Sequence, residues 1–135
     1  MTDTVTSQKL ADGDRNVIYH FTNISDGTGE SGVTKVDVSG LNANTKNGAA
    51  CAYVSIESIT FSCSGMGVQI LEDATADVLV AALPPDTSGA FYYDEFGGIV
   101  NSKAAGYNGD ILFTTVGALS GDTYSITMKM RKHYA

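Results

Sequence analysis

The sequence predicts an all-β protein, an antiparallel β-sandwich of about eight short strands. Apolar residues recur at every second position or in short runs, and no segment of convincing length repeats with the period of a helix. Clusters of Gly, Asn, Asp and Ser separate these segments at fairly regular spacing. Eight strands do not fix the connectivity, and a jelly roll is one arrangement that they allow.

The chain of 135 residues is long enough for one domain with a two-layer core. Residues 1–15 are polar and end in a turn signal at 12–14, so we expect an extended N-terminal arm. Residues 16–135 then form a single β-sandwich domain. The arm is suited to reaching a neighbour by strand addition, and simple terminal disorder is the alternative.

The first strand of the domain carries Val17, Tyr19 and Phe21 on one face. A strong turn signal at 25–29 leads to a second strand at 33–38, so the two are predicted to form a hairpin with a long loop.

The segment 53–63 is a long strand with a change of phase. Val54 and Ile56 have one parity, and Ile59 and Phe61 have the other. A bulge near 57–58 would restore one common face, and the bend would let the strand cross to the other sheet.

Further strands are predicted from shorter patterns. The run 77–83 is unbroken and apolar, as in a strand buried on both faces, and Pro84 ends it. The alternation in 124–130 is the cleanest in the sequence. The remaining predicted strands are 66–70, 91–93 and 109–116.

The net charge of −7 excludes binding to DNA by phosphate neutralisation and disfavours an anionic membrane. The N-terminus has no basic segment followed by an apolar one, so we expect a chain that is assembled from the cytoplasm. Cys51 and Cys63 are predicted to be buried thiols, because two cysteines and two distant histidines do not readily supply a zinc site. We expect no cofactor and no metal.

Two motifs match binding loops by letter only. Residues 27–32 read G-x-G-x-x-G, but a strand follows where a dinucleotide site needs a helix. Residues 12–16 begin like a calcium loop, yet Val17 and Asn23 occupy positions that require Gly and Glu.

Candidate catalytic groups are few. The acidic pairs 72–73 and 94–95 are adjacent in sequence, so their side chains point apart in a strand or are solvated in a loop. The sequence leaves open whether Cys63 or a serine lies beside His20 as a nucleophile, but no family signature supports such a pair. We therefore expect a protein that is not an enzyme.

The densest aromatic cluster is 91–96, which suits core packing, a protein interface or a sugar platform. Four of the eight basic residues are Lys103, Lys129, Arg131 and Lys132. Three of them lie in the tail 128–135, a basic tail that is either a solvated strand face or a contact with an acidic neighbour. The candidate contact residues are Arg15, Tyr92, Tyr93 and Arg131.

The segments 12–17, 25–30 and 33–39, together with the closing segment 121–127 and Arg131, resemble small virion structural proteins of tailed bacteriophages. The resemblance covers about a third of the chain, at its two ends. It implies a capsid decoration (cement) protein, often a β-sandwich or jelly roll, which sits on the capsid surface, often as a trimer.

The resemblance implies that such a protein binds between subunits of the major capsid protein and has no catalytic residues. We therefore expect a homo-oligomer, with a trimer favoured, which assembles in the host cytoplasm and functions in the virion. A head–tail adaptor, a tail protein or a head-fibre base protein would show a similar sequence. A sugar-binding β-sandwich module is the alternative from a different class.

Overall fold

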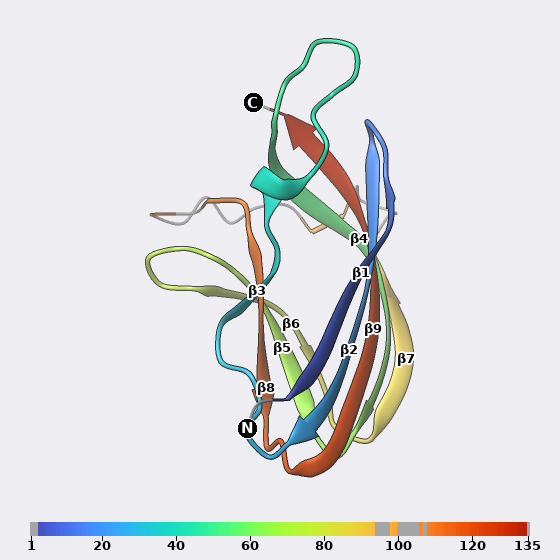
Figure 1. Cartoon of the computed structure of the whole chain (residues 1–135), viewed down its shortest axis with the longest axis vertical. Helices are drawn as coiled ribbons and strands as arrows, with labels where there is room; N and C mark the ends of the chain where they lie inside the picture. Colours follow the sequence, from blue (N-terminus) through green and yellow to red (C-terminus); the bar gives the residue numbers. More distant parts are fainter. Residues whose placement is uncertain (1–2, 94–97, 100–105, 107, 135) are drawn as a thin grey trace.

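The computed structural model describes residues 3–93, 98–99, 106 and 108–134 and places them in two facing antiparallel β-sheets (Figure 1). The five-stranded sheet has the order β1-β2-β9-β4-β7. Its strands are β1 (Thr4–Asp12), β2 (Asn16–Asp26), β4 (Cys51–Ser64), β7 (Thr87–Tyr92) and β9 (Ser120–Tyr134).

The second sheet has four strands in the order β3-β8-β5-β6. These are β3 (Val33–Val36), β5 (Gly67–Glu72), β6 (Val78–Leu83) and β8 (Ile111–Val116). A 3-10 turn, η1 (Val38–Gly40), follows β3. Figure 1 shows the β4–β5 and β8–β9 connections at one end of the two layers and the loop 41–50 projecting at the other. The predicted all-β antiparallel sandwich is confirmed, whereas this strand order does not show a jelly roll.

The core lies between the sheets and is formed by alternate residues of the strands. Tyr124, Ile126, Met128 and Met130 on β9 are all buried, as their alternation predicts. The Phe113 ring of β8 packs edge-on against Phe21 of β2, with ring centroids 5.1 Å apart. These contacts join the two layers.

The phase change in 53–63 is a β-bulge, as predicted. The register of β4 on β9 shifts between Ile56 and Ser58. The shift leaves the apolar residues on both sides of it facing the core, because one extra residue inverts the alternation. These residues are Val54, Ile56, Ile59, Phe61 and Cys63. The expected crossing to the other sheet is wrong, since β4 pairs with β9 along its whole length.

The predicted hairpin of 17–22 with 33–38 is also wrong. Strand β2 pairs with β1 and β9, whereas β3 pairs with β8 in the other sheet. The loop 27–32 therefore carries the chain from one layer to the other. One amide of this loop does bind an anion, but a local one. The Gly29 backbone N–H, together with the Asp26 N–H at the end of β2, donates a hydrogen bond to the Asp3 carboxylate, both at 3.1 Å.

Two further segments differ from the expectation. Residues 4–12, expected in an arm, are extended but pair with β2 as the edge strand β1. The run 77–83 forms β6, an edge strand in which Leu79 is exposed, so it is not buried on both faces. Apolar content alone does not distinguish a central strand from an edge strand that shares one face with the core.

Buried polar clusters close both ends of the sandwich. At one end Lys132 pairs with Asp12. At the other, the Glu30 carboxylate pairs with Lys35 at 2.5 Å and accepts a hydrogen bond of 2.6 Å from the Tyr124 hydroxyl. Each cluster ties a loop to β9 or β3. In the described part of the chain, no helix is long and apolar enough to cross a membrane.

Candidate binding surface

The outer face of the five-stranded sheet carries rows of hydroxyl groups. Strand alternation points one set of side chains away from the core, and the register aligns that set across neighbouring strands. One row crosses all five strands and consists only of hydroxyl residues. This hydroxyl row is Thr6, Thr22, Ser125, Ser62 and Ser88.

The rows on either side also contain no Lys, Arg, Asp or Glu. They are Gln8, His20, Thr127, Thr60 and Ala90 on one side and Thr4, Ile24, Thr123 and Ser64 on the other. We call the three rows together the hydroxyl face. In a chain of net charge −7, this face presents donors and acceptors without fixed charge. Hydroxyl groups can rotate to donate or accept, so the face can satisfy a varied partner.

The hydroxyl face contains an open hollow of about 410 Å³. Ile24 at its wall is 58% exposed, although it is a large apolar residue. The other lining residues are mainly hydroxyl residues of four strands, namely Thr4, Thr6, Thr22, Asn23, Ser62, Thr123, Tyr124 and Ser125. The hollow therefore combines the exposed Ile24 side chain with threonine and serine hydroxyl groups, because the side chains of Asn23 and Tyr124 are buried.

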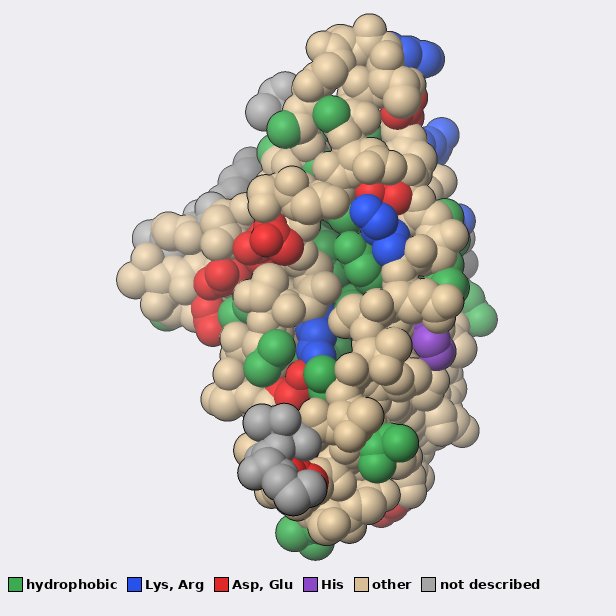
Figure 2. Space-filling model, viewed as in Figure 1, with side chains coloured by type: hydrophobic (Ala, Val, Ile, Leu, Met, Phe, Trp, Pro, Cys, Tyr) green, Lys and Arg blue, Asp and Glu red, His purple; other side chains and the backbone are tan. Residues whose placement is uncertain are grey.

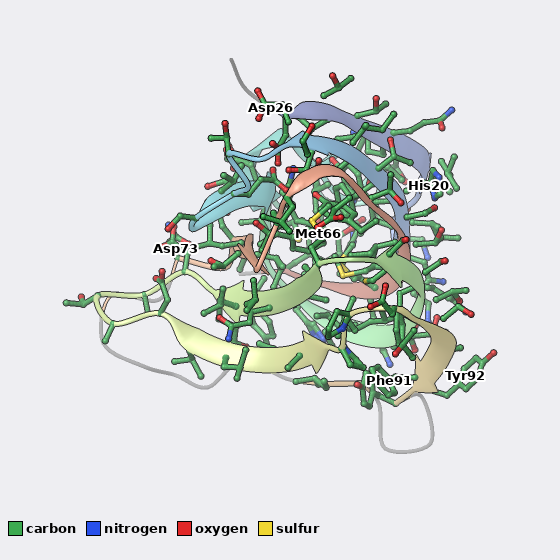
Figure 3. All side chains as sticks on the ribbon, turned by 90° about the horizontal axis from the view of Figure 1, so that it is seen from below. His20, Asp26, Met66, Asp73, Phe91 and Tyr92 are labelled. Carbon is green, nitrogen blue, oxygen red and sulfur yellow. The ribbon has the colours of Figure 1, made fainter. Side chains whose placement is uncertain are left out.

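An aromatic side chain borders the hydroxyl face at the β7 edge. Tyr92 is 70% exposed and projects from β7 away from the body of the protein, whereas Met66 lies between the layers (Figure 3). The Tyr92 side chain lines a second hollow of about 250 Å³ with Glu57, Ser58 and Lys129. An exposed ring beside one carboxylate and one ammonium group is suited to a protein or a sugar partner.

The other candidate contact residues fall in different settings. Arg131 is exposed on the outer face of β9, and Arg15 is exposed in the β1–β2 turn, where its carbonyl accepts a hydrogen bond from the Lys132 backbone N–H. Arg15 and Arg131 thus lie at the same end of the sheet. Tyr93 is half-buried and packs against Phe91, with ring centroids 6.2 Å apart.

The basic tail is divided between surface and interior. Lys129 and Arg131 are exposed, while Lys132 points inward to Asp12 of its own chain. Lys103 lies outside the described residues. The surface seen in Figure 2 shows scattered charged side chains among mostly uncharged polar groups and backbone.

His20 forms its side-chain hydrogen bond with a threonine. Its Nδ1 atom lies 2.8 Å from the hydroxyl of Thr127 on the outer face. Cys63 is buried on the inner face of the same sheet, and burial raises the pKa of its thiol. The two side chains are therefore on opposite faces, which contradicts a Cys63–His20 pair.

A different serine and histidine do meet. The Ser55 hydroxyl lies 2.6 Å from Nε2 of His133, whose ring stacks on Tyr53. Burial, and then the charge of Arg131, lower the pKa of His133. Ser55 is 0% exposed, and a Cβ at Gly98 would lie 3.1 Å from it. A substrate cannot reach this hydroxyl, so the pair has a structural role.

Comparison of the chain with protein-family models, with curated proteins and with solved structures gave no match. The candidate surface is therefore defined only by the residues and contacts of this chain. Within the described residues, no group of three or more His, Cys, Asp or Glu side chains is arranged to hold a metal ion.

The hydroxyl row was not predicted from the sequence. Each strand on its own shows only polar residues at outward positions, which every half-exposed strand has. The signal was present as the repeated choice of Ser and Thr at those positions in β4 and β9, but the alignment of the rows requires the register. The sequence alone places Lys129 in the basic tail. Its position beside Tyr92 follows from the strand register, in which Tyr92 of β7 and Lys129 of β9 both pair with Ser58 of β4.

Proposed function

We propose that the chain is a phage virion structural protein that decorates and stabilises the capsid by binding between major capsid protein subunits. The resemblance of its two ends to small virion proteins supports this proposal. The observation that carries it is the hydroxyl face, a broad sheet surface that lacks fixed charge and that no other described strand covers. Docking through such a face does not require desolvation of charged groups, which is costly.

Multiplicity supports the same function. A decoration protein binds a lattice in many copies, so moderate contacts suffice where several act together. The exposed Ile24 and Tyr92 supply apolar contact at two places, and the hydroxyl rows between them supply hydrogen bonds. Lys129 beside Tyr92, and Arg131 further along β9, would meet an acidic patch on the capsid protein.

Co-sedimentation with virus heads that lack the protein tests the proposal. The unmodified chain should pellet with heads and remain in solution with isolated tails. Ser62→Arg places a charged side chain in the centre of the hydroxyl row and should weaken binding at least tenfold. Gln69→Arg makes the same change on β5 of the other sheet and should bind like the unmodified chain. Binding to tails alone would instead assign the chain to another virion component.

Sugar binding is the second candidate, and the hollow beside Tyr92 favours it. An exposed tyrosine ring can stack on a sugar, while Glu57 and Lys129 can bind its hydroxyl or carboxylate groups. Titration with neutral and acidic oligosaccharides, followed by tyrosine fluorescence, tests this function. A saturable change that Tyr92→Ala removes would support it, and a flat titration would exclude it for those sugars.

A further inference from the structure

Strand β1 forms one edge of the five-stranded sheet, and no described residue pairs with its outer side. Every residue from Thr4 to Ala11 is exposed. In an edge strand the N–H and C=O groups that point away from the sheet are unpaired and can accept a further strand.

Natural proteins usually protect such an edge with charge, proline or a bulge. The segment 4–8 has none of these, since it reads Thr-Val-Thr-Ser-Gln. The first charged residue is Lys9, and the register irregularity lies between Lys9 and Ala11. Five consecutive residues of regular, uncharged strand are therefore open to pairing.

The other three edge strands are shorter. β3 has four residues, and β6 and β7 have six each, while β1 has nine. β7 also contains Gly89, which weakens a strand because it has no side chain to pack. Among the described strands, β1 thus offers the longest open edge.

We propose that β1 pairs antiparallel with β1 of a second copy of this chain, about a two-fold axis at Thr6. Thr6 then faces Thr6 of the other copy, Val5 faces Ser7, and Thr4 faces Gln8. Cross-strand threonine pairs are favourable, and a two-fold axis makes the contact self-complementary. Two five-stranded sheets become one continuous sheet of ten strands, and the hydroxyl rows continue across the junction.

Charge favours this contact over others between two copies. The chain has a net charge of −7, yet Thr4 to Ala11 contains no carboxylate, so the edges meet without acid–acid repulsion. The adjacent carboxylate, Asp3, is buried and accepts hydrogen bonds from Asn23 and Ser25, so its charge is held within its own chain.

The topology disfavours joining the two different edges of the sheet. All neighbours in the order β1-β2-β9-β4-β7 are antiparallel, so β1 and β7 run in the same direction. A head-to-tail ring that joined β7 to the next β1 in a continuous sheet would need parallel pairing, which is slightly less stable per residue. The pairing therefore leads to a dimer, in contrast to the trimer that the virion resemblance implies.

Sedimentation equilibrium measures the result directly. The unmodified chain of 14.1 kDa should sediment with twice that mass. Thr6→Lys places two ammonium groups opposite each other and should give a monomer with an unchanged circular dichroism spectrum. Ser88→Lys alters the same hydroxyl row at the opposite edge and should remain a dimer. A monomeric or trimeric unmodified chain, or a dimeric Thr6→Lys variant, would overturn the pairing.

A cross-linking measurement tests the register. Thr6→Cys should form a disulfide between two copies under mild oxidation, since the two residues face each other. Gln8→Cys should form little, because it faces Thr4. Equal cross-linking of both variants would contradict the register. The pairing is independent of the proposed function, because a monomer that still pellets with heads would overturn only the pairing.

Discussion

Lys132 and Asp12 are 120 residues apart in the chain, yet Nζ of the lysine lies 2.6 Å from Oδ1 of the aspartate. The lysine side chain is 0% exposed and the aspartate side chain 3%. Nζ also donates to the carbonyl groups of Gly13 and Asn42. The ammonium group thus has three oxygen partners and joins the β1–β2 turn, the loop 41–50 and the last strand.

Replacing Lys132 by methionine should destabilise the fold by about 3 kcal/mol, because it leaves the Asp12 carboxylate buried without its main partner. Urea unfolding measures the difference. Lys129→Met removes an exposed lysine of the same strand and should change stability by less than about 0.5 kcal/mol. Equal stability of the two variants would refute the role of the buried pair.

Acid should weaken the same cluster. Burial by itself raises the pKa of Asp12, but hydrogen bonds from Lys132, the Asn42 backbone N–H and Lys9 more than offset it, so the pKa lies below its ordinary value of 3.8. A lowered pKa in the folded state means that the ionised carboxylate contributes stability above the unfolded value. That contribution is lost as the pH falls through the folded value. The stability difference between the unmodified chain and Asp12→Asn should be constant near pH 6 and shrink below about pH 4.

The loop between the layers should be sensitive at one glycine. Gly29 has φ of 74°, and a Cβ there would lie 2.6 Å from the hydroxyl oxygen of Thr115, which accepts a hydrogen bond from the Glu30 N–H. Gly32 has φ of 59° with nothing within 4 Å. Both alanine variants incur a cost of about 1 kcal/mol for positive φ. Gly29→Ala should lose more, and a melting temperature equal to that of Gly32→Ala would exclude the clash.

The two thiols should be unreactive in the folded protein. Burial raises the pKa of Cys51 and of Cys63, and both side chains lie in the core. A thiol reagent at pH 8 should modify them only as fast as the chain unfolds, because the thiolate is the reactive form. Fast labelling of either cysteine in the absence of denaturant would contradict this packing.

Part of the fold could be predicted from the sequence because the core residues of β9 alternate, as do those of β4 on each side of its bulge. The alternation of β9 and the phase change of β4 identified the face of each strand and the bulge between them. Strand β1 was not recognised, since all but the last of its residues are exposed and neither face is marked by apolar residues. Its pairing with β2 depends on the backbone and on the Asp12 cluster, which no local pattern reveals.

The candidate surface could be predicted only in part. Tyr92 and Arg131 follow from the preference of interfaces for Tyr and Arg. The hydroxyl row does not, because it depends on the registers of four strand pairs, and two of these pairs, β2 with β9 and β4 with β9, join distant parts of the chain. The predicted hairpin of 17–22 with 33–38 is wrong for a similar reason, because the sequence does not show which strands pair. A turn signal locates a change of direction, but it does not determine whether the chain stays in one sheet.

We propose that the chain binds a capsid through the outer face of its five-stranded sheet. Electron cryomicroscopy of virus heads, prepared with and without the purified protein, would show which face meets the shell. We expect added density between capsid subunits in which the row from Thr6 to Ser88 faces the shell. Decorated heads in which the four-stranded sheet faces the shell would contradict binding through the hydroxyl face. Heads without added density at saturating protein would contradict capsid binding itself.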